Sequence, residues 1–390
     1  MGRASRPPLP PGLNPRRNGY NRFMLGRFAA SLGVLRPRAV ARTQKSVDAL
    51  LAETQETRRA LKQLADGQAR GQAASEEVLA RLEAMSGDLR ALQGQVKVLA
   101  LRESQLTAVM KADAAQEGAL ADLAAICDRE AVGARIRAAV DEAELHLEPF
   151  PYMLVRNVFP DDYYDALVRG IPPVEVFNGK PFNKQQIKVP FVLAPAYSRR
   201  VWNFFVNRVG PRVLQPAVLE KFRKPLEQWI AANWPALADN PFAPPMNFNL
   251  GDGRIMLRGR GYRIPPHRDP KWGFVTCLLY LAREEDSEAW GTQLFSVDED
   301  PPARGAAPHW IDPARCRLAA DIPFRRNTML VFLNSTGAHG AQIPDDAEPA
   351  DLTRYTYQCR IGPSGQAIRA LMATLPEENV PLWAGKVSSY

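Results

Sequence analysis

The chain has 390 residues, of which 46% are hydrophobic and 24% charged, as expected for a soluble globular protein with a sizeable core. Its four cysteines, Cys127, Cys277, Cys316 and Cys359, are far apart and form no CxxC pair. This argues against a zinc site or a disulfide framework and favours a reducing compartment. There is no apolar run of about 18 residues and no secretory signal, so we expect a cytoplasmic protein without a membrane span.

The positive charge is concentrated at the start of the chain. Residues 1–45 contain nine Arg, one Lys and no acid, whereas the whole chain has a net charge of +8, so the remainder is slightly negative. Arginine mixed with proline predicts a mostly disordered tail over 1–45. Apolar residues around Phe23, Leu25 and Phe28 leave a second reading open, in which the tail contacts an anionic membrane surface peripherally.

A seven-residue repeat follows over residues 46–118. It predicts a coiled coil, because apolar side chains at alternating steps of three and four form one narrow helical seam. A homo-oligomer or a helical partner would bury that seam, and the alternative is a long helix folded back on the next domain. Residues 119–147 are expected to be a helical linker. The seam residues are Val47, Leu50, Thr54, Thr57, Leu61, Leu64, Val78, Leu82, Met85, Leu89, Leu92, Val96 and Leu99.

The pattern changes again near Pro149. From there the chain shows short β-rich runs separated by Gly and Pro turns, which predicts a β sandwich or barrel with helices at its front. The fold class is therefore α+β. We expect the β-rich domain to span 148–372 and to be followed by a C-terminal tail over 373–390.

The stretch PPHRDPKWG contains a candidate pair of metal ligands. His267 and Asp269 are two residues apart, so in an extended segment both side chains point to the same side. His339, after the apolar run TMLVFL, is a candidate third ligand. Two histidines and one carboxylate suit non-haem Fe(II) and leave coordination positions open. HRD also occurs in protein kinases, but the asparagine of that motif is absent here because Phe274 occupies its position.

A second set of residues could bind an anion. In TRYTYQCRIG, strand alternation places Arg354 and Thr356 on one face, where a guanidinium and a hydroxyl can bind a carboxylate. Tyr280, on the strand after the HRD motif, could reach the same anion. Arg360 lies on the face of Arg354, and we take it as a solvated strand end. His146 and His309 are expected at the surface, and Trp272 and Trp290 either line the entrance or pack under loops.

The order HRDPKWGFVTCLLYL, WGTQLF, NTMLVFLNSTGAHGA and RYTYQCRIGP resembles the Fe(II)- and 2-oxoglutarate-dependent dioxygenases, particularly their prolyl-hydroxylase-like branch. The resemblance covers roughly residues 149–365. It implies a double-stranded β-helix (jelly-roll) domain with iron held by His267, Asp269 and His339. It also implies that Arg354 and Thr356 bind 2-oxoglutarate and that Tyr280 contacts it. A tyrosine common in the family is not matched, because Leu257 stands at its position.

The resemblance implies an oxidoreductase that uses Fe(II), 2-oxoglutarate and O2, with ascorbate as a candidate reductant. It would hydroxylate a protein, glycan-linked or small-molecule acceptor and release succinate and CO2. Two alternatives remain open. One is dealkylation of nucleic acid, which the RxxxxxR spacing of Arg354 and Arg360 would suit, although the catalytic half is not basic and shows no base-reading lid. The other is a non-catalytic coiled-coil scaffold whose barrel binds iron and oxoglutarate.

Overall fold

The computed structural model describes residues 37–65, 72–178, 183–244, 246–300 and 309–383, and it divides into two compact units, 1–104 and 105–390. Most of the expected basic tail lies outside the described residues, as does the segment 384–390 of the expected C-terminal tail. Residues 37–45, which we had assigned to the tail, belong to the first helix.

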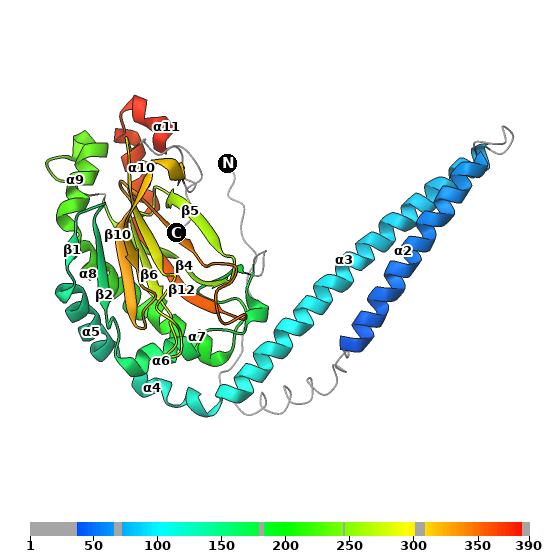
Figure 1. Cartoon of the computed structure of the whole chain (residues 1–390), viewed down its shortest axis with the longest axis horizontal. Helices are drawn as coiled ribbons and strands as arrows, with labels where there is room; N and C mark the ends of the chain where they lie inside the picture. Colours follow the sequence, from blue (N-terminus) through cyan, green and yellow to red (C-terminus); the bar gives the residue numbers. More distant parts are fainter. Residues whose placement is uncertain (1–36, 66–71, 179–182, 245, 301–308, 384–390) are drawn as a thin grey trace, which may run out of the picture. The chain divides into compact units, whose positions relative to one another are not determined.

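The first unit contains a pair of long helices, α2 (Pro37–Ala65) and the greater part of α3 (Gln72–Gln116). The helices lie side by side and run in opposite directions (Figure 1). Arg58 forms an ion pair with Glu83, and Gln93 donates a hydrogen bond to Asp48. The predicted helical character of this region is therefore confirmed, with the two helices in contact with each other.

The expected seam is only partly buried in this helix pair. Val47 and Ser86 are each 5% exposed, so they lie where the helices meet. Leu50, Met85 and Leu92, which we expected in the seam, are 51%, 50% and 46% exposed. The buried face thus overlaps the predicted seam, which includes Val47, but is rotated away from Leu50, Met85 and Leu92, and a coiled coil remains a prediction.

The second unit combines helices with two antiparallel sheets, which confirms the α+β class. Its helices are η1 (Gly118–Leu120), α4 (Leu123–Ile126), α5 (Arg129–Glu142), α6 (Asp161–Arg169), η2 (Val174–Val176), α7 (Ala196–Phe204), η3 (Phe205–Leu214), α8 (Gln215–Lys221), α9 (Arg223–Asn233), η4 (Pro235–Leu237), η5 (Pro313–Arg315), α10 (Gly365–Thr374), η6 (Glu377–Asn379) and α11 (Val380–Trp383). Its strands are β1 (Leu145–His146), β2 (Tyr152–Arg156), β3 (Lys184–Lys188), β4 (Phe248–Gly259), β5 (Arg263–Arg268), β6 (Val275–Tyr280), β7 (Thr292–Val297), β8 (His309–Trp310), β9 (Cys316–Ile322), β10 (Thr328–Leu333), β11 (Ala338–Gln342) and β12 (Thr353–Pro363).

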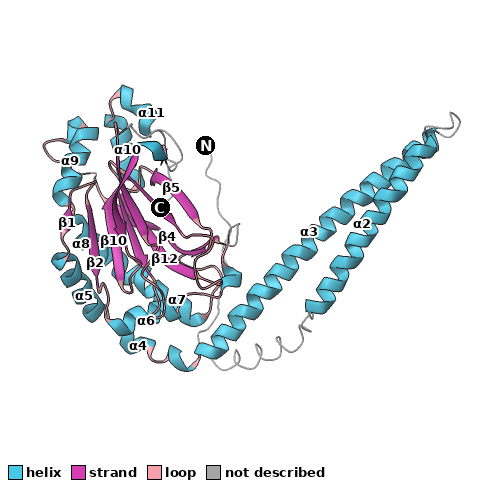
Figure 2. Cartoon of the chain, viewed as in Figure 1, coloured by secondary structure: helices cyan, strands magenta, loops and turns pink. Residues whose placement is uncertain are grey.

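The strand order is that of a double-stranded β-helix. The larger sheet has the order β1-β2-β10-β6-β12-β4-β3, and the smaller sheet has the order β8-β5-β11-β7-β9. The chain passes from one sheet to the other between β4, β5, β6 and β7, and again between β9, β10, β11 and β12. This alternation is the wrapping of a jelly roll. Helices cover one side of the sheets (Figure 2).

The two faces of the larger sheet have different neighbours. Val275, Cys277 and Leu279 of β6 pack into the core that the helices share with the sheet. Leu278 and Tyr280 point the other way and pack with residues of the smaller sheet. This alternation, which follows from the two-residue period of a strand, directs one set of β6 side chains to the space between the sheets.

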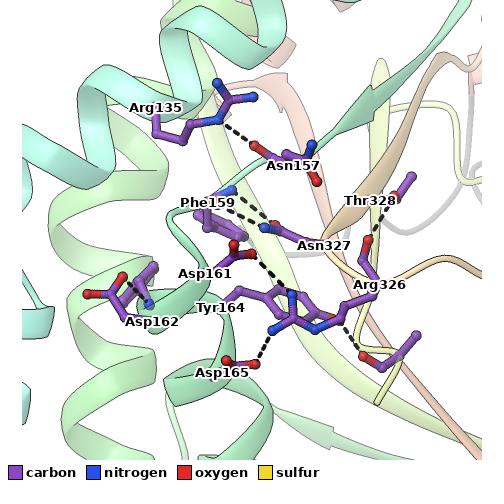
Figure 3. Close-up of polar contacts among 12 residues, drawn as sticks. Arg135, Asn157, Phe159, Asp161, Asp162, Tyr164, Asp165, Arg326, Asn327 and Thr328 are labelled. Carbon is purple, nitrogen blue, oxygen red and sulfur yellow. Dashed lines mark hydrogen bonds and ion pairs between the residues drawn. The ribbon is translucent and has the colours of Figure 1, made fainter. Parts of the chain in front are cut away.

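A polar junction joins the helical layer to the start of β10 (Figure 3). The side chain of Asn327 donates to the carbonyl of Phe159 at 2.8 Å and accepts from its backbone N–H at 3.0 Å. Arg326 pairs with Asp161 and Asp165 at the surface of α6. The buried amide thus fixes the chain where it enters α6.

Candidate metal centre

His267, Asp269 and His339 come together at one buried point. Their candidate donor atoms all lie within 4.8 Å of one another, and the three residues are 4%, 4% and 7% exposed. His267 of β5 and His339 of β11 are register partners, and their ring centroids are 4.2 Å apart. Asp269 follows directly after β5. His339 lies 72 residues after His267 in the sequence, and strand pairing makes the two residues neighbours.

The ligand side chains are held in fixed orientations. The Nδ1 atom of His267 lies 2.9 Å from the carbonyl of Pro265, so Nε2 is the nitrogen left for a metal. Thr276 donates to Asp269 Oδ2 at 2.7 Å, and Arg360 donates to Asp269 Oδ1 at 2.7 Å. Such contacts position a ligand before the metal binds.

The electrostatics keep the three groups in the protonation states that a metal needs. Burial, followed by the charge of His267, lowers the pKa of His339 to about 3, and burial also lowers the pKa of His267. Burial raises the pKa of Asp269, but the Arg360 guanidinium and the two histidines outweigh it and hold that pKa well below its usual range. Neutral imidazoles and an ionised carboxylate are the metal-binding forms.

The donor set fits Fe(II). Two imidazoles and one carboxylate form the facial set that leaves positions open for co-substrate and oxygen. The residues present therefore suit the metal that the sequence resemblance implied.

A cavity of about 290 Å³ opens onto the metal-binding residues and contains all six predicted site residues. Arg354 is 2% exposed and lines this cavity. All three of its guanidinium nitrogens lack a hydrogen-bond partner among the described residues. The group lies over the rings of Phe324 and Trp290, at 4.4 and 5.4 Å from their centroids. A buried guanidinium without a hydrogen-bond partner is costly unless a ligand supplies one.

Thr356 and Tyr280 lie beside Arg354 on the cavity wall. Thr356 is two residues after Arg354 on β12 and is the register partner of Tyr280 on β6. The hydroxyl of Tyr280 donates to Thr292 at 2.8 Å, and the side chain of Tyr280 is 1% exposed. The structure thus gathers the predicted anion-binding residues, while Leu257 lies in the core on the opposite face of β4.

The other residues singled out in the sequence have various surroundings. Arg268 forms an ion pair with Asp300 and donates to the carbonyl of Gly337. Trp272 is 1% exposed and packs against Trp383, whereas Trp290 lines the cavity. His309 of β8 is the register partner of Arg268 of β5, and the ring of His146 stacks on that of Tyr152.

Arg360 corrects one expectation. The prediction of a solvated strand end is wrong, because Arg360 is 5% exposed and contacts Asp269 and Asp252. Thr276, the register partner of Arg360, contacts the other oxygen of Asp269. Sequence alternation placed Arg360 on the inward face with Arg354. The contact itself was missed because strand β6 brings Thr276 and Arg360 to the same carboxylate only in the folded sheet.

No protein-family model matches the sequence, and no curated protein matches it significantly. The solved structures include similar folds. SnoK, a non-haem α-ketoglutarate-dependent carbocyclase from nogalamycin biosynthesis, is 11% identical over 60% of this chain and 85% of its own, with a TM-score of 0.35. A prolyl-4-hydroxylase from Pseudomonas putida is 13% identical over 58% of this chain and 98% of its own, with a TM-score of 0.32.

HygX from Streptomyces hygroscopicus, solved with nickel, 2-oxoglutarate and hygromycin B bound, is 12% identical over 55% of this chain and 83% of its own, with a TM-score of 0.30. Likenesses as distant as these do not establish a family. The chemistry of this chain is therefore inferred from its own side chains.

Proposed function

We propose that this chain is an Fe(II)- and 2-oxoglutarate-dependent oxygenase that hydroxylates an acceptor. His267, Asp269 and His339 would hold Fe(II), which with 2-oxoglutarate and O2 supplies the oxidising chemistry, with release of succinate and CO2. The order of the motifs favours a prolyl-hydroxylase-like member acting on a protein, glycan-linked or small-molecule acceptor.

The observation that carries this proposal is the arrangement of Arg354 relative to the metal-binding residues. Its buried guanidinium lines the same cavity as the His–Asp–His cluster and has no hydrogen-bond partner among the residues that the structure describes. A dicarboxylic 2-oxo acid has one end that chelates a metal and another that needs a cation. Arg354 can bind the distal carboxylate with a bidentate fork, and Thr356 and Tyr280 can each add a hydrogen bond.

The nucleic-acid alternative has less support. It relied on the spacing of Arg354 and Arg360, but Arg360 is already paired with Asp269 and Asp252 in the buried site. The charge of Arg360 is therefore balanced by two carboxylates of the protein itself.

The test measures metal binding, 2-oxoglutarate binding and succinate formation in the full chain. We expect the wild type to bind Fe(II) and to form succinate slowly without an acceptor. His267→Ala should lose the metal, whereas Arg354→Ala should keep the metal and lose 2-oxoglutarate affinity. Arg317→Ala, whose side chain is 74% exposed, is the matched control. Metal and 2-oxoglutarate binding without turnover, with every acceptor tried, would favour the scaffold alternative instead.

We further propose that the helix pair α2–α3 joins two copies of the chain as a coiled coil. Val78, Met85, Leu92 and Leu99 are spaced by seven residues on α3 and are 45%, 50%, 46% and 59% exposed. This stripe is about 32 Å long at the rise of an α-helix. Leu50 of α2 has the corresponding position in the repeat and is 51% exposed.

The side of the antiparallel helix pair that carries this stripe could bind the same side of a second copy of the chain. In two antiparallel helices, residues that flank the shared seam at equivalent heptad positions lie on the same side, so both helices contribute to one apolar surface. A twofold axis would pair that surface with itself. Two such helix pairs would form a four-helix bundle and bury the apolar stripe.

A further inference from the structure

The cavity contains more positive charge than the proposed co-substrate uses. Its lining includes five basic side chains, Lys184, Arg254, Arg258, Arg354 and Arg360, and a single carboxylate, Asp269. Asp252, outside the lining, pairs with both Arg254 and Arg360. Fe(II) and a doubly charged 2-oxoglutarate would offset one another. The cavity would therefore remain positive with both bound.

Three of these cations form a row across neighbouring strands. Arg354 of β12 is the register partner of Arg258 of β4, and Arg258 is the register partner of Lys184 of β3. All three side chains line the cavity. Like charges directly opposite each other on a sheet destabilise it. An anion bound between Lys184 and Arg258 would remove the repulsion between those two.

Lys184 and Arg258 have no acidic partner among the described residues. Arg258 donates to the carbonyls of Gln185 and Leu257 and lies 4.7 Å from the centroid of the Tyr262 ring. Lys184 is exposed at the edge of the larger sheet. Its charge therefore stands at the open end of the cavity, whereas Arg354 is buried two strands further in.

We infer that Lys184 and Arg258 form a second anion-binding subsite, which recognises a phosphate group on a small acceptor molecule. This inference rests on the proposed function, because it identifies the substrate class of the same cavity. Two cations suit a dianion such as a phosphate monoester better than a single carboxylate. The cavity volume of about 290 Å³ lies at the lower end of the range for ligand pockets, which favours a small acceptor.

The test uses phenyl phosphate as the probe and the full chain, first without metal, so that phosphate cannot act as a metal ligand. Calorimetry measures its affinity for the wild type, Lys184→Ala, Arg258→Gln and Arg354→Ala. Benzoate serves as the singly charged comparison. Lys224→Ala, an exposed lysine of α9 that does not line the cavity, is the matched control. The wild-type titration is repeated with 2-oxoglutarate and Mn(II) present.

We expect phenyl phosphate to bind more tightly than benzoate and to remain bound when 2-oxoglutarate is added. Lys184→Ala and Arg258→Gln should each weaken it about tenfold, because each removes one charge-assisted contact. Arg354→Ala and Lys224→Ala should leave it nearly unchanged. Arg258→Gln also removes contacts to the backbone and could unfold the protein. Lys184 makes no side-chain contact with an acidic partner among the described residues, so Lys184→Ala decides the question in that case.

The inference is overturned if Lys184→Ala binds phenyl phosphate as the wild type does, or if benzoate binds equally well. It is also overturned if 2-oxoglutarate displaces the probe and Arg354→Ala abolishes its binding, because the probe then occupies the co-substrate site. Failure of the proposed function has a different signature. In that case 2-oxoglutarate does not bind, or binds regardless of Arg354→Ala, while the phosphate result stands.

Discussion

Arg360 Nη2 lies 2.7 Å from Oδ1 of Asp269, so the only carboxylate of the proposed metal site is already paired with a buried cation. Arg360 also pairs with Asp252, and Thr276 donates to the second oxygen of Asp269. The ligand carboxylate is thereby held ionised and in one rotamer. This arrangement makes Arg360 a positioning residue for the metal site.

Replacing Arg360 by Ala should lower metal affinity about 10- to 100-fold, because residues that orient a ligand typically contribute that much. The same change should destabilise the metal-free protein by roughly 3–5 kcal/mol, because it leaves a buried carboxylate without its cation. Calorimetric titration with Mn(II) and denaturant unfolding measure the two effects. Arg360→Lys should recover part of the stability, and Arg317→Ala should behave as the wild type. Unchanged Mn(II) affinity in Arg360→Ala would refute the positioning role.

The hydroxyl of Tyr280 is expected to contribute to 2-oxoglutarate binding. Tyr280→Phe should weaken that binding roughly 10- to 100-fold, the effect of one hydrogen bond to a charged carboxylate, and should leave metal affinity unchanged. Tyr357→Phe removes a hydroxyl from the opposite, helix-facing side of the sheet and is the control. Equal 2-oxoglutarate affinity in wild type and Tyr280→Phe would leave Tyr280 with only its structural contact to Thr292.

The junction shown in Figure 3 predicts unequal effects for two neighbouring residues. Asn327→Ala should destabilise the fold by about 2–5 kcal/mol, because the buried N–H and carbonyl of Phe159 lose the side-chain hydrogen bonds that Asn327 provides. It also places alanine at a backbone φ of 51°, which asparagine tolerates better. Arg326→Ala removes partly exposed ion pairs and should cost only about 0–1 kcal/mol. Denaturant unfolding compares the two, and similar losses would contradict the assignment.

Self-association through α2 and α3 should depend on one side of the helix pair. Leu92→Glu places a charge in the apolar stripe and should shift the full chain toward the monomer. Val98→Glu changes a side chain that is equally exposed, at 49%, but lies at a heptad position away from the stripe, and should leave the mass unchanged. Sedimentation or light scattering measures the mass. A monomeric wild type would remove the proposed dimer.

The inward set of β12 illustrates what could be predicted from sequence. Period-two alternation placed Arg354 and Thr356 on one face, and the structure puts both on the cavity wall. The same pattern on β6 placed Tyr280 inward. Local periodicity is sufficient here because the two faces of the larger sheet have different neighbours. One face packs against the helices, and the other faces the smaller sheet.

The helical region shows the limit of periodicity. The repeat correctly predicted long helices. Apolar residues at alternating steps of three and four do not fix which neighbouring face of the helix is buried. Contacts between α2 and α3 bury Val47 and Ser86 and leave Leu50 and Leu92 half exposed. Which face is buried depends on how the two helices pack against each other, and the repeat does not encode that.

The sequence by itself determined the chemical identities and the strand faces: two histidines and an aspartate in the spacing of metal ligands, and an arginine on an inward strand face. Only the tertiary structure decided the pairings between distant segments. It placed His339 beside His267, Arg360 against Asp269, and Lys184 next to Arg258. The physical reason is that side-chain direction follows from local backbone geometry, whereas the register between strands far apart in sequence is set by packing of the whole jelly roll.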